Sequence, residues 1–292
     1  RLQLRRLLVK KFMLSFAVLA ITSLGFAQTS VETVMRQQRE AASTRTEKKA
    51  AQAAIRSPFA TANCSFTFTS GSGLTFLKYC VTVNGNITLF ESPQDEEHIA
   101  VGQDGEGYGI CDLNTNVGYY DYAEFGDSGN WNPPTVVSRT AKSVKIARTT
   151  NDGLWTLTQT INQIAGPSPS AKIIMALKNN SAISKTALLI RYANADAANT
   201  FENNLDSTLT SAFAWNSISN GEPFGLMLQN VGTPQAGFLI GFVQKVPNGP
   251  QPCTATAEEG PLKATDGAIA MGYELILPKN GSRTVNVAYK SF

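Results

Sequence analysis

Histidine is nearly absent from this sequence, because 292 residues contain only His98. A Ser-His-Asp or Cys-His hydrolase would have to use that residue, and a zinc site built from several histidines is excluded. No Gly-x-Ser-x-Gly sequence or other local nucleophile signature accompanies it. The sequence therefore favours a surface or strand-end histidine over a catalytic base, although Glu96 and Glu97 beside it would make the ring more basic.

Long apolar runs are also scarce. The run from Phe12 to Ala20 is shorter than the roughly 20 residues that a membrane-spanning helix needs. It follows two lysines, and the segment ends in Gly25-Phe26-Ala27, which is the pattern of a secretory signal peptide. We predict a bacterial signal peptide over residues 1–27, with Val9 as a candidate start. The mature protein is then secreted, periplasmic or on the cell surface, with no stable membrane span.

Cysteine is limited to four residues, and none are spaced as Cys-x-x-Cys. An even number of cysteines in an exported chain indicates disulfides rather than a metal site. Three pairings are open. We favour Cys64 with Cys80, which closes a short hairpin, and Cys111 with Cys253, which ties distant segments. In the chain-entropy model the second bridge stabilises more, because it constrains a longer loop.

The excess of positive charge lies outside the predicted folded part. The whole chain carries a formal charge of +3, but from Pro58 onward 14 Lys and Arg residues face 19 Asp and Glu residues. The folded part is therefore acidic, which argues against nucleic acid as its partner.

Glycine and proline are missing from residues 30–56, which are rich in Ala, Gln, Glu and Arg. This composition predicts a helix. Its few apolar positions are mostly alanine, so the helix has little surface to bury. We interpret residues 28–57 as a polar helical stalk or spacer; a cleaved propeptide and a helix that docks on a partner are the alternatives.

Helix-length periodicity is absent from Phe59 onward, where β-forming and polar residues alternate instead. Residues 143–161 form the clearest hairpin pattern, with Asp152-Gly153 at its turn. About ten to twelve such strands with regular turn signals predict an all-β fold. We expect a large two-sheet antiparallel β-sandwich over residues 58–292, with residues 165–171 as a loop between hairpins.

Basic side chains are missing from Glu91 to Asp127, where ten of the domain's acids lie. Carboxylates without cationic partners repel one another. The segment is therefore expected either to expose these carboxylates to solvent or to bind a cation such as calcium. Tyrosine and tryptophan faces, on which sugar rings stack, follow in residues 116–131. A sugar site, a calcium site and a structural strand with a solvated loop all fit this segment.

Within that stretch the alternation in Tyr-Tyr-Asp-Tyr places Tyr119 and Asp121 on one face of a strand and two tyrosines on the other. We predict a ligand-binding face that includes Tyr120, Tyr122 and Trp131, and the wider predicted ligand-binding set is Tyr120, Tyr122, Trp131, Asp121 and Asp127.

Residues 194–208 form a second polar segment, which we predict to be a loop. Asp196, Glu202 and Asp206 offer the hard oxygen ligands that calcium prefers, but the order of an EF-hand and its central glycine are missing. A calcium site here is therefore a speculative prediction, and a turn region rich in Asn and Asp is the alternative.

Taken together, these features predict a secreted or cell-surface binding module, non-enzymatic, whose partner is extracellular glycan or protein, with no required cofactor. One alternative is a glycan-active enzyme that uses two carboxylates between Glu91 and Asp127. Another is a structural subunit of a surface assembly that makes its contacts through residues 30–56.

Overall fold

The computed structural model describes residues 64–99, 105–123, 126–217, 223–245, 251–255, 257–258 and 260–292. The predicted signal peptide and the predicted stalk over residues 28–57 lie outside these ranges. Among the described residues, no helix is long and apolar enough to cross a membrane.

A three-stranded antiparallel sheet opens the described part of the chain. It consists of β1 (Phe66–Ser70), β2 (Leu77–Val81) and β3 (Ile87–Glu91), with the short 3-10 helix η2 (Gly73–Thr75) between the first two strands. A disulfide joins Cys64 to Cys80 of β2, so the predicted pairing is confirmed.

The other fourteen strands form one continuous antiparallel path that is divided into two layers. The layer that we call the smaller sheet has the order β6, β5, β4, β11, β16, β15. Its strands are β4 (Glu106–Asp112), β5 (Val117–Tyr122), β6 (Gly126–Asp127), β11 (Lys185–Asn194), β15 (Phe238–Lys245) and β16 (Leu262–Leu277).

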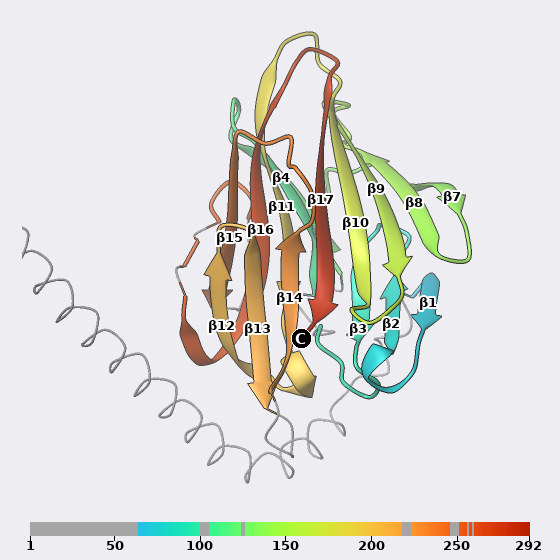
Figure 1. Cartoon of the computed structure of the whole chain (residues 1–292). Coiled ribbons are helices and arrows are strands. Elements are labelled where there is room, and N and C mark those ends of the chain that lie inside the picture. Colours follow the sequence, from blue (N-terminus) through green and yellow to red (C-terminus); the bar gives the residue numbers. More distant parts are fainter. Residues whose placement is uncertain are drawn as a thin grey trace, which may run out of the picture. The chain divides into compact units, whose positions relative to one another are not determined.

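The second layer, which we call the larger sheet, has the order β12, β13, β14, β17, β10, β9, β8, β7 (Figure 1). Its strands are β7 (Thr135–Arg139), β8 (Ser143–Thr149), β9 (Trp155–Ile164), β10 (Ser170–Asn179), β12 (Glu202–Thr208), β13 (Ser211–Ser217), β14 (Pro223–Asn230) and β17 (Ser282–Ser291). The long strand β16 joins the layers, because its start pairs with β12 and the rest of it pairs with β11.

The hydrophobic core is made by the inward-facing residues of these strands. Strands β8, β9 and β10 alternate buried and partly exposed residues, as a half-buried antiparallel strand should. The largest core side chains are fully or almost fully buried: Trp155, Tyr79, Tyr108, Tyr119, Tyr273, Tyr289 and Phe90. The predicted all-β antiparallel sandwich is confirmed.

Two details differ from the prediction. The described residues form seventeen strands rather than ten to twelve. Residues 202–208, predicted as part of a polar loop, form β12 inside the larger sheet. Asn203 and Leu205 of this strand are fully buried, and the side-chain N–H groups of Asn203 donate to the carbonyls of Ala195 and Thr200 at 2.6 and 2.8 Å.

Candidate functional site

The two sides of strand β5 have different roles, and the predicted alternation explains why. Tyr119 and Asp121 face the core between the sheets, whereas Tyr120 and Tyr122 face outward from the smaller sheet. The strand that carries most of the predicted ligand-binding residues therefore contributes to two places. One is the outer surface of the smaller sheet, and the other is a buried polar centre, which we define by Glu106, Asp121, Arg148 and Arg191.

Three acids of the segment from Glu91 to Asp127, which contains no Lys or Arg, form ion pairs with cations from other strands. Asp121 pairs with Arg148 of β8, Glu106 pairs with Arg191 of β11, and both pairs are almost completely buried. In the same layer Lys185 lies 2.6 Å from Asp112. The cations come from strands that follow the acidic segment by more than twenty residues. The expectation of unpaired, repelling carboxylates is therefore wrong for these three acids.

The buried polar centre also holds the turn between β2 and β3. Asn84 and Asn86 of that turn donate their amides to the carboxylate of Asp121 at 2.8 and 3.1 Å. The Arg191 guanidinium donates to the carbonyl of Gly85 at 3.2 Å. Charged hydrogen bonds of this kind, buried on every side, anchor the three-stranded sheet to the sandwich. We assign these residues a structural role.

Trp131 belongs to the inward side. Its ring packs edge-on against Tyr108 and Tyr119, with ring centroids 5.7 and 6.3 Å apart, and its exposed fraction is 8%. The expectation that it shares a face with Tyr120 and Tyr122 is therefore wrong, because the chain crosses to the core side after β6. Asp127 pairs with Asp121 in the register of β5 and β6, but its side chain is not among those described.

The outer face of the smaller sheet is apolar and aromatic. Tyr120 stacks on Tyr122 at 5.4 Å, and Tyr122 contacts Tyr192 at 5.1 Å. Across the five strands from β5 to β15 the register aligns these and further outward-facing residues in three rows. We call this surface the aromatic face and define it by Tyr120, Tyr122, Leu188, Ile190, Tyr192, Phe238, Ile240, Phe242 and Glu274.

Part of the aromatic face is open. Phe238 is 52% exposed, and Tyr120, Leu188, Ile240 and Glu274 are partly exposed. The outer faces of antiparallel sheets are normally polar where they meet water. Contiguous exposed apolar side chains on a sheet face mark an interaction surface.

A short segment that follows β15 lies on this face and adds polar groups to it. Gln251 donates its amide to the Tyr120 hydroxyl at 3.0 Å. Pro252 sits over Gly109, where an added Cβ atom would lie 2.6 Å from the proline ring, so only glycine fits there. The second disulfide joins Cys253 of this segment to Cys111 of β4, which confirms the predicted pairing.

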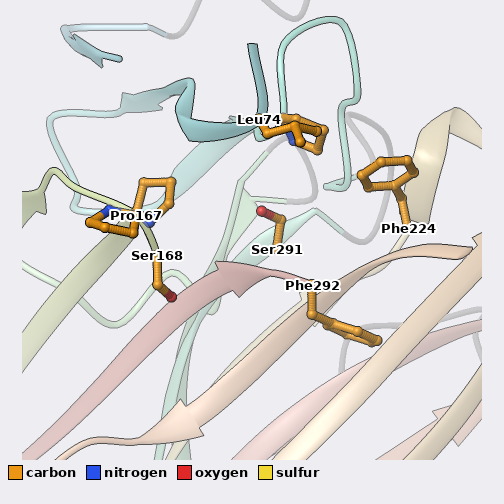
Figure 2. Close-up of a pocket in the computed structure, with 8 residues that line it drawn as sticks. Leu74, Pro167, Ser168, Phe224, Ser291 and Phe292 are labelled. Carbon is orange, nitrogen blue, oxygen red and sulfur yellow. The ribbon is translucent and has the colours of Figure 1, made fainter. Parts of the chain in front are cut away.

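A second surface feature is a pocket of about 150 Å³ at the end of β17. Figure 2 shows Leu74, Phe224 and Phe292 around it, together with Pro167 of the loop between β9 and β10. The Ser291 hydroxyl at its wall is already bonded to the Ser92 hydroxyl at 2.8 Å. The residues that line the pocket carry no charged side chain. The pocket could therefore accommodate a small apolar group, and its lining offers no side chain for acid-base catalysis.

The predicted calcium ligands are not grouped. Asp196 precedes the 3-10 helix η3 (Ala197–Asn199), whereas Glu202 and Asp206 lie on β12. In the described part of the chain, no three His, Cys, Asp or Glu residues come together as a metal site. Calcium binding stays a prediction.

His98 is fully buried, so its interpretation as a surface residue is wrong. Its Nδ1 accepts a hydrogen bond from the Ala198 N–H at 3.0 Å, and its Nε2 lies 2.6 Å from the Ser92 carbonyl. This arrangement fixes the neutral ring with the proton on Nε2, which clamps the turn at Ser92 to the turn at Ala198. Burial lowers the pKa of His98 to about 4, while its bond to Ser92 opposes the change.

This clamp predicts a pH dependence of stability. In the unfolded chain the ring binds a proton near its ordinary pKa of about 6.5, but in the folded protein it does so only near pH 4. Stability is therefore complete above about pH 6.5 and decreases as the pH falls towards 4, by about 3 kcal/mol from this residue. Urea unfolding across this range measures the loss.

The control is His98→Gln, whose amide can accept from Ala198 and donate to Ser92 but does not titrate. We expect this variant to show a shallower pH dependence than the natural protein by about the same 3 kcal/mol. Identical pH profiles for the two proteins would show that His98 does not titrate on unfolding.

Comparisons with known proteins come from structure alone. No protein family matches the chain, and no curated protein resembles it in sequence. Among solved structures, 78% of the chain superposes on a bacterial glucoamylase complexed with acarbose, with 12% identity and a TM-score of 0.50. The chain spans about a third of that enzyme, namely 32% of its length.

Two other solved structures match over nearly their whole length. One is described as a possible aldose 1-epimerase from Escherichia coli K12, with 10% identity, a TM-score of 0.44 and coverage of 78% of this chain and 99% of the other. The other is a galactose mutarotase-like protein from Lactobacillus casei, with 8% identity, a TM-score of 0.47 and coverage of 78% and 100%. At these identities the similarities concern the fold.

Proposed function

We propose that this protein is an exported, non-enzymatic binding module for extracellular glycan and that the aromatic face is its recognition surface. The observation that carries this proposal is the partly exposed, stacked Tyr120 on an outer sheet face whose defining residues are apolar or aromatic except for Glu274. A solvated sheet has no structural need for such a face.

The chemistry of the face suits a sugar ring. The C–H groups of a pyranose pack on an aromatic ring, and Tyr120 is held in place from below by Tyr122. The Gln251 amide beside it and the partly exposed Glu274 carboxylate, three strands away on β16, offer a donor and an acceptor for the hydroxyls of an oligosaccharide. A binding site that is mostly apolar with a few oriented polar groups is the usual composition of a ligand site.

The shared fold is compatible with this proposal but assigns no residue. The bacterial glucoamylase that shares the fold over about a third of its length is described as complexed with acarbose. Protein rather than glycan remains the alternative partner of the same face, because exposed Phe238 and Leu188 would also suit a protein surface.

The glycan-active enzyme is the second candidate, and one observation bears on it. A glycosidase needs two carboxylates on opposite sides of one bond. Glu274 is the one carboxylate among the residues that define the aromatic face, and Glu106, Asp112 and Asp121 each pair with a separate buried cation. We therefore favour binding, and a turnover assay on the same glycans tests the enzyme alternative.

The proposal predicts that Tyr120→Ala weakens binding to the recognised oligosaccharide at least about tenfold, because the stacking surface is lost. Tyr120→Phe keeps the ring and should retain most of the affinity. Binding is measured by calorimetry with oligosaccharides selected on a glycan array. Phe201→Ala, which removes a half-exposed ring at the start of β12, is the matched control.

Two results would contradict the proposal. One is an array on which the natural protein binds no glycan. The other is a Tyr120→Ala variant that is folded and binds as tightly as the Phe201→Ala control.

A further inference from the structure

Charge is segregated along this chain. Between Asp127 and Asp196 the sequence has eight Lys and Arg residues but a single acid, Asp152. Three of these bases are used internally, because Arg148, Lys185 and Arg191 pair with buried acids of β4 and β5. The remaining five have no such role, and they are Arg139, Lys142, Lys145, Lys172 and Lys178.

The larger sheet carries three of these cations, Lys145, Lys172 and Lys178, on its outer side. Strands β8, β9, β10 and β17 lie side by side in Figure 1, and the register aligns Lys172 of β10 with Asn162 of β9 and Ala288 of β17. Because side chains alternate, residues flanking the buried Ile173 and Met175 face outward. We call this outer surface the basic face and define it by Lys145, Lys172, Lys178 and Lys290.

The lysines of the basic face are not neutralised by their surroundings. Strands β7, β8, β9, β10 and β17 contain no Asp or Glu. Within the described ranges no ion pair involves Lys145, Lys172 or Lys178, and Lys290 bonds to the uncharged Gln229 amide oxygen at 3.1 Å. In a domain with a net negative charge, five adjacent strands without carboxylates present a local positive potential, and the acids of the larger sheet, Glu202 and Asp206, lie on β12, beyond β13 and β14.

Spacing on the face favours a polymer over a small anion. Lys172 and Lys178 are six residues apart on one strand, which is about 20 Å at the rise of a β-strand. Lys145 lies two strands away from them, about 10 Å across the sheet. A small anion would meet one lysine at a time, whereas an extended polyanion contacts several.

The uncharged residues between the lysines indicate which polymer fits. Most of them carry hydroxyl and amide groups, which hydrogen-bond to sugar hydroxyls: Thr156, Thr158, Thr160, Asn162 and Asn286. The apolar ones are Ile174, Ala176 and Ala288. A membrane surface would instead need large apolar side chains to insert. The strongly exposed large apolar residues of strands β7 to β10 and β17 are few and lie at one edge of the sheet or at a strand end: Val136 and Val137 on β7, with 45% and 51% exposure, and Ile164 at the end of β9, with 42%.

We propose that the basic face is a second binding surface, separate from the aromatic face, and that its ligand is an acidic polysaccharide such as a polyuronate. The two outer faces belong to opposite layers of the sandwich. The aromatic face then recognises sugar rings by stacking, whereas the basic face holds the carboxylates of a charged chain by electrostatic attraction and hydrogen bonds.

The test uses the full chain and polygalacturonate, with neutral dextran as the uncharged comparison polymer. We expect binding to polygalacturonate that weakens at least about tenfold when salt rises from about 50 to about 500 mM, because salt screens exposed charges. The triple variant Lys145→Gln, Lys172→Gln, Lys178→Gln should lose at least about tenfold in affinity at low salt.

A matched control removes the same charge elsewhere. Lys78→Gln, Lys245→Gln, Lys263→Gln changes three lysines on β2, β15 and β16 and should retain binding. Tyr120→Ala should also bind polygalacturonate normally, which separates this surface from the proposed glycan site.

Three results would overturn the proposal: equal losses in the two triple variants, natural affinity in the Lys145, Lys172 and Lys178 variant, or no binding of polygalacturonate at low salt. Anionic vesicles of phosphatidylglycerol and phosphatidylcholine form a further arm. If the protein binds these vesicles through the same lysines and does not bind the polysaccharide, the face is a membrane surface instead.

Discussion

Arg191→Met is expected to lower the free energy of unfolding by about 3–5 kcal/mol, because it leaves the carboxylate of Glu106 buried without its cation. Glu106 and Arg191 are both completely buried. The carboxylate also accepts from the Tyr289 hydroxyl at 2.9 Å and from the Ile87 N–H at 2.5 Å. Burial raises the pKa of Glu106 while the attraction of Arg191 opposes that rise, so the variant carboxyl should be neutral. Urea unfolding at neutral pH measures the loss.

A double variant separates the lost partner from the lost packing. Arg191→Met with Glu106→Gln removes both charges, and we expect it to be more stable than Arg191→Met alone. The exposed pair Lys78–Glu91, 3.4 Å apart, is the control, since Lys78→Met should cost less than about 1 kcal/mol. The loss of unfolding free energy in the double variant is compared with the sum of the losses in Arg191→Met and Glu106→Gln. If the double variant loses as much as that sum, the ion pair has no coupling energy and our account of the polar centre is wrong.

Removal of the disulfide between Cys111 and Cys253 is expected to be the second large effect. This bridge closes a sequence separation of 142 residues, compared with 16 for Cys64–Cys80. In the chain-entropy model the long loop contributes about 5 kcal/mol and the short one about 3 kcal/mol, because the unfolded chain loses more freedom when distant residues are joined. The double variant Cys111→Ser, Cys253→Ser should therefore be the less stable of the two double serine variants.

The same variant also reports on the aromatic face. Cys253 fixes the segment in which Gln251 bonds to Tyr120 and Pro252 covers Gly109. We expect oligosaccharide affinity to fall in Cys111→Ser, Cys253→Ser and to be unchanged in Cys64→Ser, Cys80→Ser. Thermal unfolding and calorimetry on both proteins give the two readouts. Greater stability loss in the Cys64 and Cys80 variant would contradict the loop-length argument.

The sequence predicted those strands that have one face buried in the core and the other face exposed to solvent. Residues 143–149 and 155–164 alternate apolar and polar residues around Asp152-Gly153, and they form β8 and β9 as expected. Strand β4, with the sequence Glu-Gly-Tyr-Gly-Ile-Cys-Asp, is buried at every residue and has no such alternation. Strand β12 was missed for a different reason, because its polar Asn203 is buried, with the side-chain N–H groups donating to nearby backbone carbonyls.

The candidate site was predictable only in part. Local alternation correctly separated Tyr119 and Asp121 from Tyr120 and Tyr122, because it depends on backbone geometry alone. It did not reveal that β11, β15 and β16 would complete the aromatic face, since Leu188, Ile240 and Glu274 lie more than sixty residues further along the chain. No local signal in the sequence marks such neighbours.

By itself, the sequence determined the class of fold, which follows from residue periodicity and turn residues. It favoured the two disulfides that the structure contains among the three pairings that four cysteines allow. Only the tertiary structure decided how charge is used. The sequence places ten acids between Glu91 and Asp127 without a base, and the fold brings Arg148, Lys185 and Arg191 to three of them. Strand pairing sets such contacts across the sheets, and the Coulomb energy depends on distance in space rather than in sequence.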